Sequence, residues 1–262
     1  MAYGIRRSLL SAGDPDAQAY ILRAGVTDPV AKAAINSFVK GIKGMGLWNS
    51  LVCWPLISTQ NAGTGTTAYS LGGLGAYNGT LTNGPLWTTT GISMSGGSEY
   101  IGWSKTGVFA SAMTQIASFV ILNGTQSIDG MGHQDGGQAF NGYVPASTQI
   151  QGRLKTSAAL YNQDKVGLTG VIGQLRSWIS NSFSNHAITS SGLIQDGSPV
   201  STSGTLTLVP STFYIGRDSI YGSTAIGKIP FYSVFSQGLT FSTSQALYSL
   251  YKATLGASLG LP

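Results

Sequence analysis

Ionisable side chains are scarce in this chain of 262 residues, since only 9% are charged against roughly a quarter in ordinary soluble domains. Glycoside hydrolysis needs two carboxylates about 5 to 10 Å apart across a cleft, and on one strand such a pair needs a spacing of two or four residues. Asp14, Asp16 and Asp28 belong to predicted helix starts, and the other acids leave no such spacing. We therefore expect no catalytic residues and predict that the chain is not an enzyme.

Cysteine is nearly absent, because Cys53 stands alone. An intramolecular disulfide is excluded, and with only two histidines in the chain no Cys/His metal cluster is expected. The run Gly72–Gly75 lacks the lysine of a phosphate-binding loop. We expect no cofactor and no bound metal, and we interpret Cys53 as a buried apolar thiol.

Long apolar runs are also missing. No stretch reaches the 18 residues of a membrane span, and the start of the chain has no secretory signal. These observations predict a soluble protein made in a reducing compartment, with no membrane partner. The net charge is +5, but Arg6 and Arg7 form the only adjacent basic pair, so nucleic-acid binding is not expected.

What the chain has in abundance is glycine and apolar surface, with 37 glycines, 42% hydrophobic residues and 10% aromatic residues. This much apolar surface argues against disorder. Turn signals recur every eight to twelve residues between short apolar runs, which is typical of an antiparallel sandwich or barrel. Among these signals, Asn123-Gly124 predicts a turn, and Asp196-Gly197 predicts a hairpin between residues 193–195 and 198–200.

The first 46 residues follow a different pattern. Asp14-Pro15 and Asp28-Pro29 each predict a capped helix start, and glycines mark the helix ends. In the second helix, Ile35, Phe38, Val39 and Ile42 follow the spacing of a single apolar stripe. We predict a helical hairpin over residues 1–46 that docks one face on an apolar surface.

The residues from Ser242 onward predict a closing helix. Ser242 and Gln245 have the spacing of a capping box. Leu247, Leu250 and Tyr251 would form the apolar face of this helix, which ends near Gly256.

The C-terminal fifty residues resemble the final segment of concanavalin A/laminin-G-like domains. In that family a strand with an Ile-Gly step precedes a Gly-x-Ile strand, a Leu-Thr or Leu-Ser turn and a helix with a Leu-Tyr pair. The matching positions, over about 45 residues, are Ile215-Gly216, Gly227-Lys228-Ile229, Leu239-Thr240 and Leu247-Tyr248. The chain departs from the family at Pro230-Phe231-Tyr232, where an acidic residue is common.

A second resemblance, at the front of the chain, is to a leader found before such sandwiches in tailed-phage virion proteins. The residues that carry it are Ala24–Pro29, Ala34-Ile35-Asn36, Gly46-Leu47-Trp48 and the terminal Leu255-Gly256. Together the resemblances imply a mostly β, antiparallel jelly-roll sandwich over residues 47–262, with a helical leader over 1–46 and a short C-terminal helix.

The function that this resemblance implies is a phage virion structural protein, made in the host cytoplasm. It would act through assembly and surface display as a capsid decoration, head spike or accessory tail module. Its partners would be other virion proteins and further copies of itself, by analogy in a trimer. The alternative is a lectin-like receptor-binding module that recognises bacterial surface glycans.

Four residues are candidates for a ligand site. His133 and Asp135 lie in the glycine-rich segment Gly130–Gly137, which fits a cation or sugar site and equally a plain surface turn. Trp103 and Tyr143 lie beside turn residues, where exposed rings stack on sugars. For these rings a contact between subunits is the other interpretation, and for residues 130–137 we favour the plain turn.

Overall fold

The computed structural model describes residues 13–104, 107–134, 137–146, 148–195, 198–208, 212–217 and 225–262. Within these ranges the chain forms an antiparallel β-sandwich, preceded by two helices and followed by a third. The helices are α1 (Pro15–Arg23), α2 (Pro29–Gly44) and α3 (Phe241–Ala253), with single 3-10 turns η1 (Trp48–Ser50), η2 (Gly107–Ala110) and η3 (Ala257–Leu259). The expected mostly β sandwich with helices at both ends is confirmed.

One sheet, here called the helix-side sheet, carries the helices on its outer face. It also includes the first half of β7 (Gln115–Gln134). Its other strands are β1 (Leu51–Pro55), β4 (Leu86–Thr88), β5 (Gly91–Ser95), β11 (Val171–Ile179), β12 (Ser182–Thr189), β13 (Gly192–Gln195), β14 (Val200–Ser201) and β16 (Ile226–Phe235).

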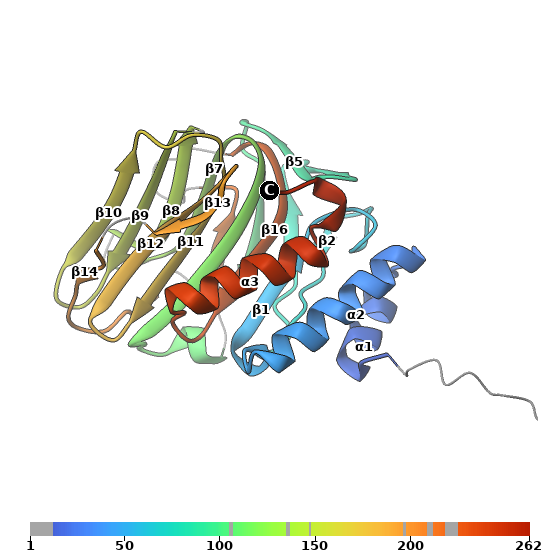
Figure 1. Ribbon diagram of the computed structural model, residues 1–262, viewed down its shortest axis with the longest axis horizontal. Coiled ribbons are helices and arrows are strands. Elements are labelled where there is room, and N and C mark those ends of the chain that lie inside the picture. The colour runs from blue at the N-terminus through green and yellow to red at the C-terminus, as the bar shows by residue number, and fades with distance from the viewer. Residues whose placement is uncertain are drawn as a thin grey trace, which may run out of the picture.

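The second sheet, here called the outer sheet, packs on the other face of the helix-side sheet and includes the second half of β7. Its other strands are β2 (Thr67–Ala68), β3 (Gly79–Thr82), β6 (Tyr100–Ser104), β8 (Gly137–Ala146), β9 (Gln149–Lys155), β10 (Leu160–Val166) and β15 (Thr212–Ile215). In Figure 1, α1 and α2 lie at one end of the molecule, and β8, β9 and β10 lie at the other.

Two apolar clusters hold these layers together. The cluster between the sheets includes Trp54, Trp103, Trp178 and Phe213, all nearly or fully buried. The cluster between the helices and the helix-side sheet joins α2 and α3 to the outward side chains of β1, β7, β11 and β16. The predicted apolar stripe lies in this second cluster, because Ile35, Phe38, Val39 and Ile42 have no exposed surface.

The helix starts follow the sequence signals closely. The Asp14 carboxylate caps α1 by accepting from the Asp16 amide at 3.0 Å, and Asp28 caps α2 by accepting from the Ala31 amide at 2.8 Å. Lys43, in the last turn of α2, forms an ion pair with Asp14 at 2.8 Å. This ion pair ties the end of one helix to the start of the other, so the two predicted helices form one unit.

The predicted cap of the third helix is wrong. Thr240, not Ser242, is the N-cap residue of α3, and its side chain accepts from the Thr243 amide at 3.2 Å. The helix therefore begins at Phe241, one residue before the expected capping box. Leu247 and Tyr251 are fully buried as expected.

One predicted turn and one predicted strand pairing are also wrong, although residues 196–197 themselves lie outside the described residues. Asn123 and Gly124 lie inside β7, where a register shift of the β16 pairing marks an irregularity in a continuous strand. The expected hairpin around residues 196–197 is absent from the described strands there, because β13 and β14 both pair with β12 and not with each other. Both dipeptides suit turns locally, but the available partner strands determine the pairing.

Buried amides join the two sheets beside β9 and β10. The Gln174 side-chain amide donates to the Gln151 carbonyl at 2.6 Å and to Asn185 Oδ1 at 2.7 Å. The Asn185 amide then donates to the Gln163 carbonyl at 2.9 Å. Gly152 leaves the room for this contact, since a Cβ there would lie 2.8 Å from the Asn185 side-chain amide.

We expect the docking of the helices to account for a large share of the stability. Phe38 is fully buried and contacts Phe231 with ring centroids 5.8 Å apart. Phe38→Ala should therefore lower the free energy of unfolding by about 3–5 kcal/mol, measured by urea denaturation. Val30→Ala is the matched control, because Val30 is 77% exposed on the same helix and its loss should cost less than about 0.5 kcal/mol. Equal losses in the two variants would show that the helices do not pack as described.

Candidate functional site

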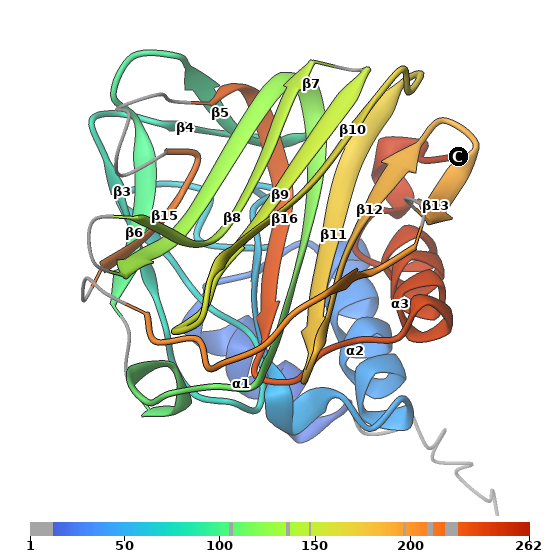
Figure 2. The ribbon, with the colours of Figure 1, turned by 90° about the vertical axis from the view of Figure 1, so that its left-hand side faces the viewer.

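A row of residues crosses the outer face of the outer sheet, one from each of seven strands. Each is the direct cross-strand partner of the next, and the row reads Thr80, Gly102, Tyr214, Gly130, Asn141, Arg153 and Asn162. The residues beside the row along the strands, such as Ile101 and Phe213, are fully buried between the sheets. The row therefore lies on the side away from the core. Figure 2 shows the molecule with β8, β9 and β10 toward the viewer.

Two tyrosines and an arginine form the distinctive cluster on this face. Tyr100 and Tyr214 are half-buried, and their rings meet edge to face with centroids 5.0 Å apart. The Arg217 guanidinium lies over the Tyr100 ring, 5.2 Å from its centroid, which is a favourable cation–π distance. The three side chains come from β6 and from the end of β15, segments more than a hundred positions apart in the sequence.

Gly216 is the residue that places Arg217 beside Tyr100. It has a φ of +87°, a backbone conformation that glycine adopts without strain. A Cβ at this position would come within 2.1 Å of the Met94 sulfur. The Ile-Gly step noticed in the sequence therefore ends β15 and redirects the chain at the point where Arg217 reaches the tyrosine.

Glycines flank Tyr214 in the row. Gly102 is its partner on β6, and Gly130 is its partner on β7. Because neither residue has a side chain, no direct cross-strand side chain covers the Tyr214 ring. The described ring contact of Tyr214 is the one with Tyr100, and the glycine positions leave room for a flat ligand beside the pair.

The charges on the outer face are mostly positive among the residues whose side chains are described. Arg153 and Lys155 are partly exposed on β9, Arg217 lies beside the tyrosines, and Asp164 is exposed on β10. Glu99 is next to Tyr100 in the sequence, but its carboxylate accepts hydrogen bonds from the Ser95 hydroxyl and the Gly97 amide. The bond from Ser95 lowers the pKa of Glu99, so this carboxylate stays ionised and engaged within the segment that connects β5 to β6.

Trp103 does not lie where the sequence suggested. It is 2% exposed and packs between the sheets, with its ring centroid 4.6 Å from that of Phe213 and 5.1 Å from that of Trp54. The expectation of an exposed ring beside a turn is wrong, because Trp103 occupies the inward position of β6 while Tyr100 and Gly102 take the outward ones.

The segment Gly130–Gly137 is not a loop in its described part. Residues 130–134 continue β7, and His133 pairs with Gln138 in a hairpin with β8. Asp135 lies outside the described residues. Tyr143 lies on β8 opposite Gln151, five residues from Gln138, or about 17 Å along the strand. The backbone therefore does not bring His133 and Tyr143 together, and their roles in ligand binding stay predictions.

Sequence reasoning missed Tyr100, Tyr214 and Arg217. Each tyrosine alternates with buried apolar residues in a short strand, which is the pattern of a half-buried strand and carries no sign of a ligand. The informative feature is the pairing of β6 with β15, which brings the two aromatic positions together. The sequence contained one usable signal, the arginine directly after the Ile-Gly step.

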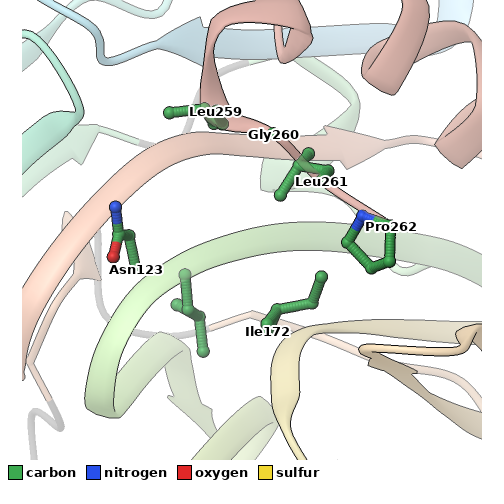
Figure 3. Close-up of a pocket in the computed structure, with 7 residues that line it drawn as sticks. Asn123, Ile172, Leu259, Gly260, Leu261 and Pro262 are labelled. Atoms are coloured by element: carbon green, nitrogen blue, oxygen red, sulfur yellow. The ribbon is translucent and has the colours of Figure 1, made fainter.

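A pocket of about 170 Å³ lies elsewhere, between the helix-side sheet and the C-terminal segment (Figure 3). Its lining is apolar apart from the Asn123 side chain and the backbone, and comprises Leu122, Asn123, Ile172, Leu259, Gly260, Leu261 and Pro262. This volume is below the range of roughly 300–1,000 Å³ typical of ligand sites. The lining has no ionisable side chain, so the pocket is a weaker candidate than the outer face.

His186 is a structural residue. It is 2% exposed on the helix-side sheet, and its ring lies 5.2 Å from that of Phe241 at the start of α3. Burial lowers the pKa of His186 to about 4, so the ring is neutral at physiological pH. Among the described residues, no group of three or more His, Cys, Asp or Glu side chains is placed to hold a metal ion.

None of the helices in the described ranges combines the length and the apolar character that a membrane crossing requires.

Comparison with known proteins identifies the fold. No family model matches the chain, and no curated protein matches it. Among solved structures, a Trypanosoma rangeli sialidase in complex with 2,3-difluorosialic acid matches 85% of this chain with 12% identity and a TM-score of 0.50. The botulinum neurotoxin serotype D binding domain matches 78% of this chain with 9% identity and a TM-score of 0.46, over 52% of its own length.

The CBM40 of a Ruminococcus gnavus IT-sialidase also matches, over 60% of this chain and 96% of its own, with 14% identity and a TM-score of 0.37. The chain spans about two fifths of the length of the sialidases that it matches. At these identities the likeness to the sialidase complex establishes a shared fold and no more.

The prediction that the chain is not an enzyme is overturned by this likeness, because the matching complex is that of a sialidase. The prediction relied on the absence of a carboxylate pair. Sialidases are an exception to that rule, since they use a tyrosine as the nucleophile. Missing paired acids are therefore no ground for excluding catalysis.

We expect His186 to make the stability of the fold depend on pH. The unfolded chain binds a proton at this residue near pH 6.5 and the folded chain only near pH 4. The contribution of the neutral His186 ring to the free energy of unfolding is therefore fully present above pH 6.5. It falls by roughly 3 kcal/mol as the pH drops to 4. Urea denaturation across this range should show a smaller loss for His186→Gln than for the wild type.

His133→Gln is the matched control, since it removes the other histidine. An unchanged pH dependence in His186→Gln would contradict the burial of a neutral ring under α3.

Proposed function

We propose that the chain is a lectin-like module that binds carbohydrate on the outer face of the outer sheet. The observation that supports this proposal is the pair of half-buried tyrosines, Tyr100 and Tyr214, with glycines at the positions beside Tyr214. A tyrosine ring offers an apolar face to the C–H side of a sugar, and its hydroxyl can bond to sugar hydroxyls. Neutral polar side chains such as Thr80 and Asn162 add hydrogen-bonding groups along the same row.

The dimensions of the face suit an oligosaccharide. Three strand spacings separate Tyr214 from Arg153, or about 14 Å. A ligand of several sugar units can therefore contact both residues at once. Among the matching structures, the complex with 2,3-difluorosialic acid and the CBM40 are named for a sugar ligand or a sialidase module. The proposal for this chain depends on the tyrosine face and not on those names.

We expect Tyr214→Ala to weaken glycan binding at least tenfold, or by about 1.4 kcal/mol, because an aromatic anchor at the centre of a site carries much of the binding energy. The measurement is screening of the wild type on a glycan array, followed by calorimetric titration of the tightest ligand. Tyr100→Ala should show a loss of similar size.

Tyr161→Ala is the matched control. Tyr161 is a partly exposed tyrosine of the same sheet, but it lies opposite the buried Leu154 and bonds to Ser203. Its removal should leave affinity within about twofold, a change of roughly 0.4 kcal/mol. Failure of the wild type to retain any glycan would contradict the proposal, and so would undiminished binding by Tyr214→Ala.

We also propose, as the sequence resemblance implies, that the module is part of a phage virion. There it would bind other virion proteins and copies of itself, by analogy as a trimer. Leu22 and Val30 favour such an attachment, because they are 81% and 77% exposed near the junction of α1 and α2. Mass spectrometry of purified particles should detect the chain. Particles that contain none of it would refute the virion role and leave the glycan proposal standing.

A further inference from the structure

We infer that the carbohydrate held on the outer face is acidic, and that Arg217 binds a sugar carboxylate. This inference rests on the proposed function, since it names the ligand class of the same site. Within the described part of the chain, the Arg217 guanidinium makes no hydrogen bond or ion pair. Its contact is the Tyr100 ring, and its Nε is buried without a partner.

The contact with Tyr100 fixes the position of the guanidinium without using its N–H groups. A cation over an aromatic ring is held by the π-electrons of the face. The Nη groups are therefore still available to a ligand that touches the Tyr100–Tyr214 pair. A guanidinium presents paired donors whose geometry matches the two oxygens of a carboxylate.

The neighbouring carboxylate does not satisfy Arg217. Glu99 adjoins Tyr100, but Ser95 and Gly97 already engage both of its oxygens, and only 9% of the residue is exposed. An arginine placed beside a ring with no described acidic partner is suited to an anion supplied by the ligand.

The rest of the face extends the same preference. Arg153 and Lys155 place two further positive charges on β9 against the single described carboxylate of Asp164. Arg153 lies in the same row as Tyr214. A glycan with acidic sugars at intervals can therefore pair with Arg217 at one end and approach β9 with the other.

The test compares acidic ligands with the same ligands after their carboxylates are neutralised. The probes are 3′-sialyllactose against its methyl ester, and tetragalacturonate against its methyl ester, alongside a glycan array that includes sulfated and phosphorylated sugars. We expect the array ligands to be mainly carboxylate-bearing, and an acidic probe to bind at least tenfold more tightly than its neutral partner. The affinity should fall as the NaCl concentration rises from 50 to 500 mM, because salt screens exposed charges.

The variants separate Arg217 from the tyrosines. Arg217→Gln should lower affinity for the acidic ligand at least tenfold and leave neutral ligands within twofold. Arg217→Lys keeps the charge without the paired donors and should retain part of the affinity. Thermal denaturation checks that both variants stay folded, and Lys155→Gln shows how much of the effect is general charge.

The outcomes distinguish this inference from the proposed function. If the wild type binds glycans through Tyr214, but neutral and acidic partners bind equally or Arg217→Gln changes nothing, the acidic ligand is refuted and the lectin-like function stands. Preference for sulfate or phosphate esters over carboxylates would also overturn it. If no glycan binds, or if Tyr214→Ala has no effect, the proposed function itself fails.

Discussion

The continuous hydrogen bonding of β7 is the constraint on which the sandwich depends. Its first half pairs with β11 and β16 in the helix-side sheet, and its second half pairs with β8 and β15 in the outer sheet. One strand thus fixes the register of both sheets. Because a one-residue slip would reverse every side chain of a strand, this register also determines that Tyr214 faces outward and Trp103 inward.

The helix starts and the apolar stripe at the front of the chain are sequence signals that the structure confirms. A capping carboxylate and a following proline act within one helical turn, so Asp14 and Asp28 marked the starts of α1 and α2 correctly. The stripe through Phe38 was equally reliable, since its spacing is a property of a single helix. Thr240 was not identified because hydroxyl residues also occupy positions 242–244, and several of them suit a cap by residue type.

The features that depend on partners distant in the sequence were not predictable. Asn123-Gly124 suits a turn, yet the strands on either side of β7 keep the chain extended. Trp103 and Tyr100 differ by three positions in one strand, and only the packing of the sheets decides which of them is buried. The candidate site arises from the pairing of β6 with β15, so a single sequence gives no direct sign of it.

The helices cover the helix-side sheet, whereas Tyr100 and Tyr214 lie on the outer face of the outer sheet. This arrangement has a consequence for copies held in an array. A neighbour seated against α1 and α2 leaves the outer sheet uncovered, so attachment and recognition do not compete for area. Copies fixed in this way would present their Tyr100–Tyr214 pairs together. Once one copy has bound a glycan, the effective glycan concentration at a neighbouring copy would be raised. If the proposed glycan binding and assembly are correct, a weak site on each copy would be sufficient for firm adhesion to a surface rich in repeated sugars.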